Sequence, residues 1–458
     1  MANKPTPASS KKNIARDELQ TPKGTRDLIG DNLLHYQGFF EKAAEIALYY
    51  GFTPIETPIL EKESLFTRAV GDGTDIVDKE MYTLKTKGGD RLALRPEGTA
   101  AVMRSYFENG FQSKPQPVML YYHGPFFRHE NPQRGRYRQF YQFGLEIMGS
   151  SKSIADATII RLTSLILQEV GLKDLTIKIN SIGDKESQAS YRRELTNYYK
   201  KHARMICPDC RDRLKNNPLR VLDCKNPKCA PIKQEAPETL EFLSPDSKAH
   251  FKQVLEYLGS MGINYEIDST LVRGLDYYSH TVFEISTTPK DDANNTVPST
   301  APLSIAGGGR YDYLGKILSG KKDVPSMGAA IGVDRLFDLP SFSKPTPRIV
   351  KKPKVFFIQL SFDAKLRCFE IIEILRRAKV PVAQSLTKDS LSAQLATAER
   401  LNVSYALILG QKEALEGTVI VRNMDTRSQD TIKVDKLPEY LKKMKWDWKW
   451  TSLTFDRS

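Results

Sequence analysis

Residues 340–353 are rich in proline, lysine and serine, and the pattern of apolar residues differs on their two sides. Before them, strand-like runs occur in groups with helices interspersed, which favours an antiparallel sheet with helices packed on it. After them, short apolar runs alternate with amphipathic segments from residue 355 to 422. That alternation predicts a small α/β domain with a largely parallel sheet. Because 458 residues also exceed what one core usually supports, we expect an α+β protein with two domains.

The domain boundaries follow from local composition. We expect a disordered basic arm at 1–20, a large domain at 21–340, a linker at 341–353, the α/β domain at 354–435 and a tail at 436–458. The large domain carries a helical insertion at 185–260, and the polar stretch 287–302 predicts a disordered loop. The tail holds Trp446, Trp448 and Trp450 at a spacing of two, which places them on one face of a strand. We expect these tryptophans to pack on protein, and stacking on RNA is the alternative.

The charge and the cysteines limit the class of protein. With 68 basic and 55 acidic residues the net charge is +13, which suits a polyanionic partner, although ordinary solubility charge is an alternative interpretation. No run of eighteen apolar residues occurs, so we expect no membrane span. The first twenty residues are polar, which argues against a signal peptide. The cysteines number five and four are clustered, which favours a reducing cytoplasm over a secreted disulfide framework.

The run LVRGLDYYSHTVFEI at residues 271–285 is the most informative motif. It places Arg273 and the adjacent Tyr277 and Tyr278 on a short loop that leads into an apolar strand. A guanidinium group matches two oxygens of a carboxylate or phosphate at once, and tyrosines supply flat apolar walls with hydroxyl groups. The motif therefore predicts a pocket for a small, partly planar anion.

Two further motifs suit a nucleotide, and a third contains a glycine run. In FFRHENPQRGRYRQF, residues 126–140, a loop dense in arginine joins two strands, and Arg128, Arg136 and Arg138 lie near Phe140. A solvated basic hairpin is the alternative. GAAIGVDR at 328–335 ends a strand of small residues with Arg335 at a helix start, where it would hold phosphate or form a structural salt bridge. AGGGRYD at 306–312 places glycines either where backbone approaches a neighbour closely or in a tight turn.

Four cysteines in the helical insertion have the spacing of a metal site. Cys207 and Cys210 form a CxxC pair, and Cys224 and Cys229 follow as a second pair. This pattern predicts a four-thiolate structural zinc site. The second pair has four intervening residues where two are commoner, so a reduced helical insertion with free thiols remains the alternative. Cys368 reads as an ordinary buried thiol.

Together these motifs resemble those of class II aminoacyl-tRNA synthetases. Residues 52–59 resemble the dimer motif of that class, 126–146 its second motif and 328–335 its third. RPEGT at 95–99 and residues 271–284 are similar to two elements of histidyl-tRNA synthetases of the bacterial type. The resemblance covers about residues 21–435. It implies a class II catalytic domain built on an antiparallel sheet, with a helical insertion and a C-terminal anticodon-binding domain.

The resemblance also implies residue roles. It implies a histidine pocket formed by Glu97, Gly98, Thr99, Arg128, Gln142, Glu146, Arg273, Tyr277 and Tyr278. It implies an ATP site formed by Arg128, Glu130, Arg136, Phe140 and Arg335, with Arg273 and Arg128 as the catalytic residues. Glu97 and Thr99 would hold the α-amino group, and Gln142 and Arg273 the carboxylate. Glu146 and Tyr278 would read the imidazole. The signature varies at Ser279 and His280, so His280 receives no role.

The implied activity is histidine–tRNA ligation in the cytoplasm by a homodimer. Its substrates would be L-histidine, ATP with Mg²⁺, and tRNA(His), with no membrane partner. One alternative is a non-catalytic, histidine-binding regulatory subunit of ATP phosphoribosyltransferase. Such subunits normally lack the C-terminal domain and have an eroded pocket, whereas this chain keeps both the domain and the pocket residues. The other alternative is an RNA-binding protein on an inactive synthetase scaffold, against which the complete set of pocket residues argues.

Overall fold

A computed structural model of the chain describes residues 19–71, 74–132, 135–224, 226–287, 302–348, 353–386 and 388–444. The chain divides into two compact units, one ending at Thr346 and the other beginning at Pro347, and each is described by itself. Most of the expected N-terminal arm, nearly all of the 287–302 loop and all three tryptophans lie outside the described residues. Within the described ranges, no helix combines the length and apolar character needed to cross a bilayer.

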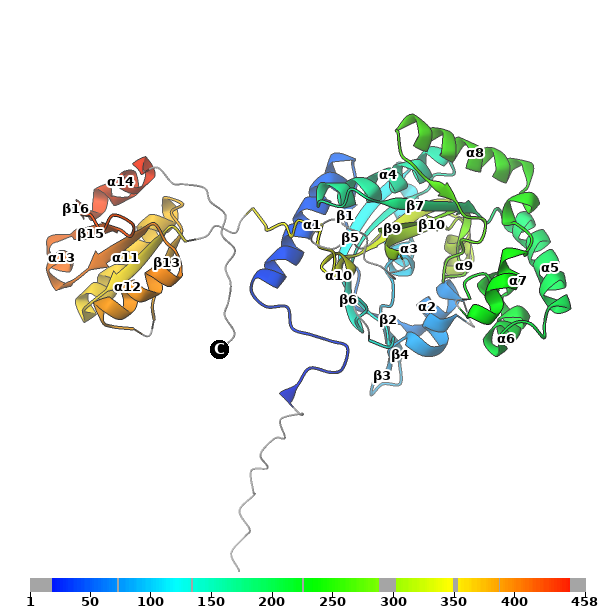
Figure 1. The fold of residues 1–458 in the computed structure, drawn as a ribbon, viewed down its shortest axis with the longest axis horizontal. Coiled ribbons are helices and arrows are strands. Elements are labelled where there is room, and N and C mark those ends of the chain that lie inside the picture. The colour runs from blue at the N-terminus through cyan, green and yellow to red at the C-terminus, as the bar shows by residue number, and fades with distance from the viewer. Residues whose placement is uncertain are drawn as a thin grey trace, which may run out of the picture. The chain divides into compact units, whose positions relative to one another are not determined.

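The first unit is built on a sheet with the strand order β1-β5-β6-β11-β10-β9-β7-β8 (Figure 1). Its strands are β1 (Thr53–Pro54), β5 (Val118–Phe127), β6 (Gln139–Met148), β7 (Thr176–Ser181), β8 (Glu266–Ile267), β9 (Ser279–Thr287), β10 (Leu303–Arg310) and β11 (Ser326–Gly332). All neighbours are antiparallel except the outer pairs β1–β5 and β7–β8. The predicted antiparallel sheet is confirmed.

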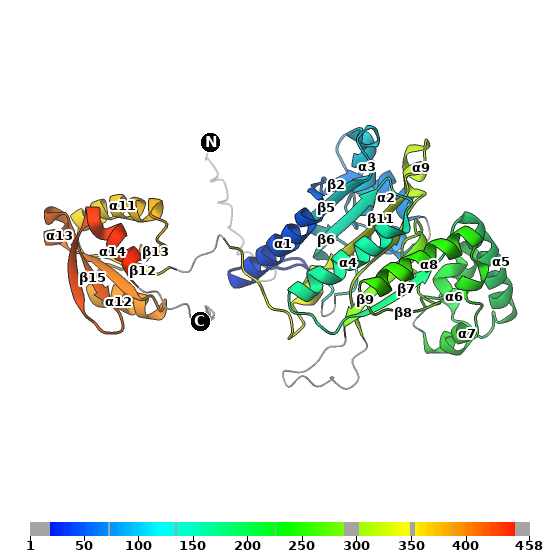
Figure 2. The same ribbon diagram turned by 90° about the horizontal axis from the view of Figure 1, so that it is seen from above.

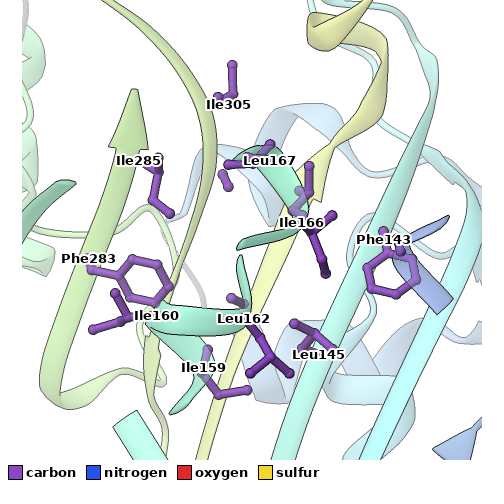
Figure 3. Packing of buried hydrophobic residues seen from close by; sticks show 14 of the residues in the cluster. Phe143, Leu145, Ile159, Ile160, Leu162, Ile166, Leu167, Phe283, Ile285 and Ile305 are labelled. Carbon is purple, nitrogen blue, oxygen red and sulfur yellow. The ribbon is translucent and has the colours of Figure 1, made fainter. Parts of the chain in front are cut away.

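Helices α1 (Asp31–Tyr49), α4 (Ser153–Glu169) and α8 (Pro245–Ser260) pack on one face of this sheet, with α4 and α8 side by side (Figure 2). In the core below α4, Phe143 and Leu145 of β6 meet Ile166 (Figure 3). Successive side chains of a strand point to opposite faces. Since Phe143, Leu145 and Ile147 enter this core, the residues that alternate with them, Gln142, Gly144 and Glu146, face the other way.

A second apolar cluster covers part of the opposite face. It includes residues of α2 (Glu63–Val70), α3 (Thr99–Glu108) and α9 (Leu314–Ser319). A small sheet joins β2 (Leu60–Lys62), β4 (Arg91–Leu94) and β3 (Thr83–Lys85). The alternating segments 81–85 and 91–95, on either side of the turn 88–90, predict a β3–β4 hairpin, and this prediction is confirmed. The short turns η2 (Ile76–Glu80) and η3 (Phe111–Ser113) and the short helix α10 (Val333–Leu336) complete the described elements of this region.

The helical insertion has a core of its own. Its elements are α5 (Lys185–Lys201), α6 (Pro208–Asn216), η4 (Pro218–Val221), η5 (Pro227–Cys229), α7 (Ala230–Gln234) and η6 (Thr239–Phe242). Tyr191, Leu195 and Tyr199 pack there around three of the four clustered cysteines. Helix α8 was predicted within the insertion, yet Phe251, Val254 and Leu258 pack in the main core instead. The insertion core therefore ends before α8.

The chain stays on the first unit beyond the predicted start of the linker at residue 341. Leu339 and Phe342 are buried in the main core, and the Ser343 backbone N–H donates to the Val170 carbonyl at 2.9 Å. A Cβ at Gly38 would lie 2.2 Å from the Pro345 carbonyl oxygen, so the backbone at Pro345 packs closely against α1. Composition placed the linker too early because proline and serine also suit an ordered surface segment.

The second unit is a five-stranded sheet with the order β13-β12-β14-β15-β16. Its elements are β12 (Val355–Gln359), α11 (Phe362–Arg377), β13 (Val382–Gln384), α12 (Leu391–Arg400), β14 (Tyr405–Leu409), α13 (Gln411–Glu416), β15 (Thr418–Asn423), β16 (Gln429–Lys433), η7 (Val434–Lys436) and α14 (Leu437–Lys443). Strand β12 runs parallel to both β13 and β14, whereas β15 runs antiparallel to both β14 and β16. The prediction of a largely parallel sheet was wrong for this edge. Leu437 and Leu441 of α14 are fully buried, so this fold also continues past residue 435.

Candidate active site

A cavity opens on the face of the first unit opposite α4, and it gathers nearly all the predicted site residues. Small residues of β11, Gly328, Ala330 and Gly332, line it and leave room above the sheet. The predicted residues on its wall are Glu97, Gly98, Thr99, Arg128, Glu130, Arg136, Phe140, Gln142, Arg273, Tyr277, Tyr278 and Arg335. Glu146 lies directly behind the wall and is fully buried.

Glu146 is held by hydroxyl groups rather than by a cation. The Thr99 hydroxyl donates to one carboxyl oxygen at 2.8 Å, and the Tyr311 hydroxyl donates to the other at 2.6 Å. A Cβ at Gly328 would lie 1.6 Å from Glu146 Oε2, so only glycine fits there. Burial raises the pKa of Glu146 to about 8, although these hydrogen bonds oppose the shift. The Glu146 carboxyl group is therefore largely protonated at neutral pH.

Glu97 is the second buried carboxyl group of the cavity. Its oxygens accept the backbone N–H groups of Thr99 at 2.6 Å and Ala100 at 3.0 Å, at the start of α3. Burial raises the pKa of Glu97, and those two N–H donors oppose the shift. Among the described residues, neither Glu97 nor Glu146 has an ion-pair partner within 4.0 Å. Two such carboxyls in one cavity favour a ligand with positive charge at that end.

Two tyrosines of this end were missed as site residues. The Tyr122 ring sits between two glycines, since a Cβ at Gly98 or Gly144 would come within 2.3 or 2.1 Å of it. Tyr311 falls inside the quoted glycine-run motif, but nothing in the sequence showed that its hydroxyl reaches a residue 165 positions away. Tyr122 could have been found from the alternation along β5, which places it on the cavity face.

Arg273 lies on the cavity wall as predicted. Its Nη1 donates to Glu284 Oε2 at 2.7 Å, and β10 passes beneath the guanidinium. A Cβ at Gly307 would come within 2.7 Å of that guanidinium, and a Cβ at Gly308 within 2.0 Å of the Gly328 carbonyl oxygen. The prediction that the glycine run marks a close backbone approach is confirmed, and the run is part of a strand rather than a tight turn.

The other end of the cavity collects guanidinium groups. Arg128 donates through Nε to the Pro96 carbonyl at 2.9 Å and lies 5.3 Å from the centre of the Phe140 ring. Arg136 reaches Glu130 at 3.4 Å. Arg335 donates to the Ser304 carbonyl, and burial together with the nearby Arg136 lowers its pKa. Such a concentration of positive charge favours a polyanionic ligand.

Arg138 and Asp334 hold the N-terminal segment against the site. Arg138 donates to the Lys23 carbonyl at 3.3 Å and is absent from the cavity wall, so its predicted contact with a nucleotide is not supported. Asp334 does line the wall and was missed. It accepts from Arg26 at 2.7 Å, from Tyr36 at 2.8 Å and from the Tyr141 backbone N–H at 2.6 Å.

The comparisons with known proteins agree with this geometry. The family model described as "Histidyl-tRNA synthetase" matches residues 24–184 and 231–336. The chain belongs to the histidyl-tRNA synthetase family. A histidine–tRNA ligase of Dehalococcoides mccartyi is 40% identical over 93% of this chain and 99% of its own length. One of Fervidobacterium nodosum is 42% identical, over 90% of this chain and 95% of its own length.

Structural comparison extends the likeness to both units. The apo histidyl-tRNA synthetase of S. aureus is 32% identical, with a TM-score of 0.76 over 93% of this chain and 100% of its own. The family model described as "Anticodon binding domain" matches residues 354–444, which includes β16 and α14. The chain therefore has the class II catalytic domain and the C-terminal anticodon-binding domain that its sequence predicts.

The four clustered cysteines lie in residues 185–230, which the family match skips. Their sulfur atoms all lie within 4.8 Å of one another. The sulfur atoms of Cys207 and Cys224 are 3.8 Å apart, and those of Cys210 and Cys229 are 3.9 Å apart. A tetrahedral zinc with Zn–S bonds of about 2.3 Å needs sulfurs about 3.8 Å apart. The long second spacing is compatible with this geometry because the η5 turn brings Cys229 back toward Cys210.

Proposed function

We propose that this chain is a histidine–tRNA ligase that binds L-histidine and ATP side by side in the cavity. One observation supports this assignment above the others. One cavity brings together four arginines, Arg128, Arg136, Arg273 and Arg335, and two buried carboxyl groups that form no ion pair with any described residue. Histidine needs negative charge for its ammonium group and acceptors for its ring, whereas ATP needs positive charge for its phosphates.

Histidine occupies the acidic end. Glu97 and Thr99 bind its α-amino group beside Gly98, and Gln142 and Arg273 bind its carboxylate. Glu146 and Tyr278 read the imidazole, with Tyr277 alongside. Tyr311 also lines the cavity, and its hydroxyl donates to Glu146. An imidazole has two ring nitrogens to satisfy, so a site built from these groups rejects analogues that lack them.

ATP occupies the arginine-rich end. Phe140 stacks on adenine, Glu130 accepts from its amino group, and Arg136 and Arg335 bind the outer phosphates. Mg²⁺ accompanies ATP and neutralises part of the phosphate charge. The histidine carboxylate attacks the α-phosphorus, the bond to the pyrophosphate oxygen breaks, and histidyl-adenylate forms. Arg128 and Arg273 stabilise the charge that develops on the α-phosphate, so no protein nucleophile is needed.

The second half-reaction uses the rest of the chain. The tRNA terminal hydroxyl attacks the adenylate carbonyl and AMP leaves, while the C-terminal unit binds the anticodon region of tRNA(His). The enzyme acts as a cytoplasmic homodimer. Exposed apolar side chains beside the first class II motif, among them Leu48, Ile59 and Leu60, support a subunit interface there. Histidine-dependent exchange of pyrophosphate into ATP tests the assignment, and an intact dimer without such exchange contradicts it.

Replacing Glu146 by glutamine should weaken histidine binding about tenfold or more, because the imidazole loses an acceptor that can carry charge. The KM for ATP should change less than about twofold, since Glu146 lies at the other end of the cavity. Exchange kinetics with each substrate varied in turn measure both constants. An equal loss for the two substrates would assign Glu146 a structural role only.

The same substitution should change the pH dependence of stability. The carboxyl group ionises near 4.5 when unfolded and near 8 when folded, so the unfolded state releases its proton first. The stability that Glu146 contributes is complete below pH 4.5 and is lost as the pH rises through 8. Because glutamine does not ionise, Glu146→Gln does not lose stability in this way as the pH rises. Its melting temperature should therefore rise relative to the wild-type value between pH 5 and pH 8.5 in thermal unfolding without ligands.

We propose that Cys207, Cys210, Cys224 and Cys229 bind one structural zinc ion. Purified protein should contain about one zinc per chain, and its removal should lower the melting temperature because the small insertion core depends on the metal. Cys210→Ser should lose the metal, whereas Cys368→Ser, in the other unit, should retain it. Absence of zinc together with four freely titrating thiols in the folded protein would exclude the site.

A further inference from the structure

The loop that reads histidine has no regular structure of its own. Residues 271–278, which carry Arg273, Tyr277 and Tyr278, contain neither helix nor strand. A loop holds functional side chains at defined positions only if other elements anchor it. Its first anchor is Leu271, whose carbonyl accepts from Asn180 Nδ2 at 3.0 Å. At its end, Tyr277 is buried in the second apolar cluster.

Between these ends the loop is a thin wall between two cavities. Arg273, Leu275 and Tyr278 line the active-site cavity on one side and a smaller cavity on the other. The far wall of the smaller cavity belongs to the insertion and includes Arg192, Asn217 and Arg220. Because the smaller cavity separates the loop from the insertion, only a few contacts across that cavity hold the middle of the loop.

Most of those contacts come from the insertion, and one comes from Val70 of α2. Asn217 Nδ2 donates to Asp276 Oδ1 at 2.7 Å, and the Asp276 backbone N–H donates to the Val70 carbonyl at 3.2 Å. Val272, next to Arg273, packs against the insertion core. Gln188 of α5 donates to the Tyr278 carbonyl at 3.1 Å. Of these groups, Asn217 alone binds a side chain in the middle of the loop.

The four-cysteine cluster fixes the position of Asn217. This residue joins α6 to η4, and it is 9% exposed. Cys207 and Cys210 lie at the beginning of α6, while the Cys224 backbone N–H donates to the last residue of η4 at 3.2 Å. The two short elements that flank Asn217 are thus held together by the cluster. Arg213 and Arg220, on either side, both contact Asp75 at 3.3 and 3.4 Å, which fixes this edge against the catalytic domain.

We propose that Asn217 is a positioning residue for histidine recognition, through which the four-cysteine insertion holds Arg273 and Tyr278 in place by way of Asp276. The inference rests on the proposed function, because it concerns the same pocket. Asn217 touches no substrate. Its loss leaves the pocket residues present but lets their loop move into the smaller cavity. Displacement of this loop should weaken histidine binding and lower kcat through Arg273. ATP binding should change little, because the ATP end of the cavity is formed by β6, β11, α10 and the described residues between 128 and 138.

The test measures histidine and ATP binding separately by calorimetry on the full-length dimer, together with exchange kinetics. Asn217→Ala should raise the Kd and KM for histidine about tenfold, as expected for loss of a hydrogen bond to a charged group. The KM for ATP should stay within about twofold. Lys215→Ala serves as the matched control, because Lys215 is on the same helix, is 77% exposed and lies outside the smaller cavity.

An exchange of partners separates positioning from general destabilisation. Asn217→Asp alone places two carboxylates together and should also weaken histidine binding. Combining it with Asp276→Asn restores one donor facing one acceptor, and the histidine Kd should return to within about threefold of the wild-type value. Unchanged histidine binding in Asn217→Ala, equal losses for both substrates, or no recovery in the double variant would each overturn the proposal. A wild-type protein that neither binds histidine nor exchanges pyrophosphate would instead refute the proposed function itself.

Discussion

Arg273→His should fold and assemble like the wild-type protein but lose histidine-dependent pyrophosphate exchange by about 10²- to 10³-fold, chiefly in kcat. The guanidinium forms part of the cavity wall and is held toward it by Glu284 at 2.7 Å. Removing one preorganised donor from a transition-state site typically costs about 10²–10³ in rate. A shorter imidazole, mostly uncharged at neutral pH, supplies neither the fork of donors nor the permanent charge.

Two further variants test the position of the Arg273 guanidinium rather than its chemistry. Gly307→Ala would place a Cβ within 2.7 Å of the Arg273 guanidinium, so it should displace that group and lower kcat with every catalytic residue still present. Gly259→Ala is the matched control, since its Cβ would meet nothing within 4 Å. Near-normal turnover by Arg273→His would refute the assigned role. Normal turnover by Gly307→Ala would show that β10 does not fix the guanidinium.

The fold could be predicted where periodicity and packing agree. The β5–β6 pair, the β3–β4 hairpin and the strand–helix alternation of the second unit up to β15 follow from apolar patterns. Strand β16 was missed because its side chains are mostly exposed, so no apolar alternation marks it. Helix α14 was assigned to the tail because few of its residues, Leu437, Tyr440 and Leu441, contact the core among charged neighbours.

The candidate site could be predicted only as far as its motifs extend. Most of the arginines and tyrosines within the quoted motifs reach one cavity, because each motif fixes its own local geometry. Contacts between distant segments carry no such signal. Arg26 meets Asp334 across 308 positions, and Asn217 meets Asp276 across 59. Glu146 illustrates the intermediate case: its position was found from the motif, whereas the hydroxyl groups that hold its carboxyl group, those of Thr99 and Tyr311, come from other elements.

A chain ending at Arg348 should keep histidine-dependent exchange within a few-fold of the intact enzyme while its aminoacylation of tRNA falls by more than about 10²-fold. The chemistry needs only the cavity of the first unit, which has its own core. The choice of Arg348 as the last residue of the truncated chain follows from the structure. Phe342 is buried, and the Pro345 carbonyl lies at the Gly38 backbone, so a chain cut at residue 340 would lose contacts that belong to the catalytic unit.

Salt dependence identifies the cause of that loss. Phosphate contacts dominate tRNA affinity, and each one neutralised adds to the slope of log affinity against log salt concentration. The truncated chain should therefore bind tRNA more weakly and with a shallower slope than the intact protein. Light scattering must show that it has the same oligomeric state as the full chain, because an exchange defect in a dissociated protein would report on the proposed subunit interface instead. A dimeric truncation that charges tRNA as well as the full chain would mean that the C-terminal unit is not the tRNA reader. If the truncated chain retained a steep slope of tRNA affinity against salt, the main phosphate contacts would lie on the catalytic unit. The C-terminal unit would then recognise the tRNA without adding to the affinity for it.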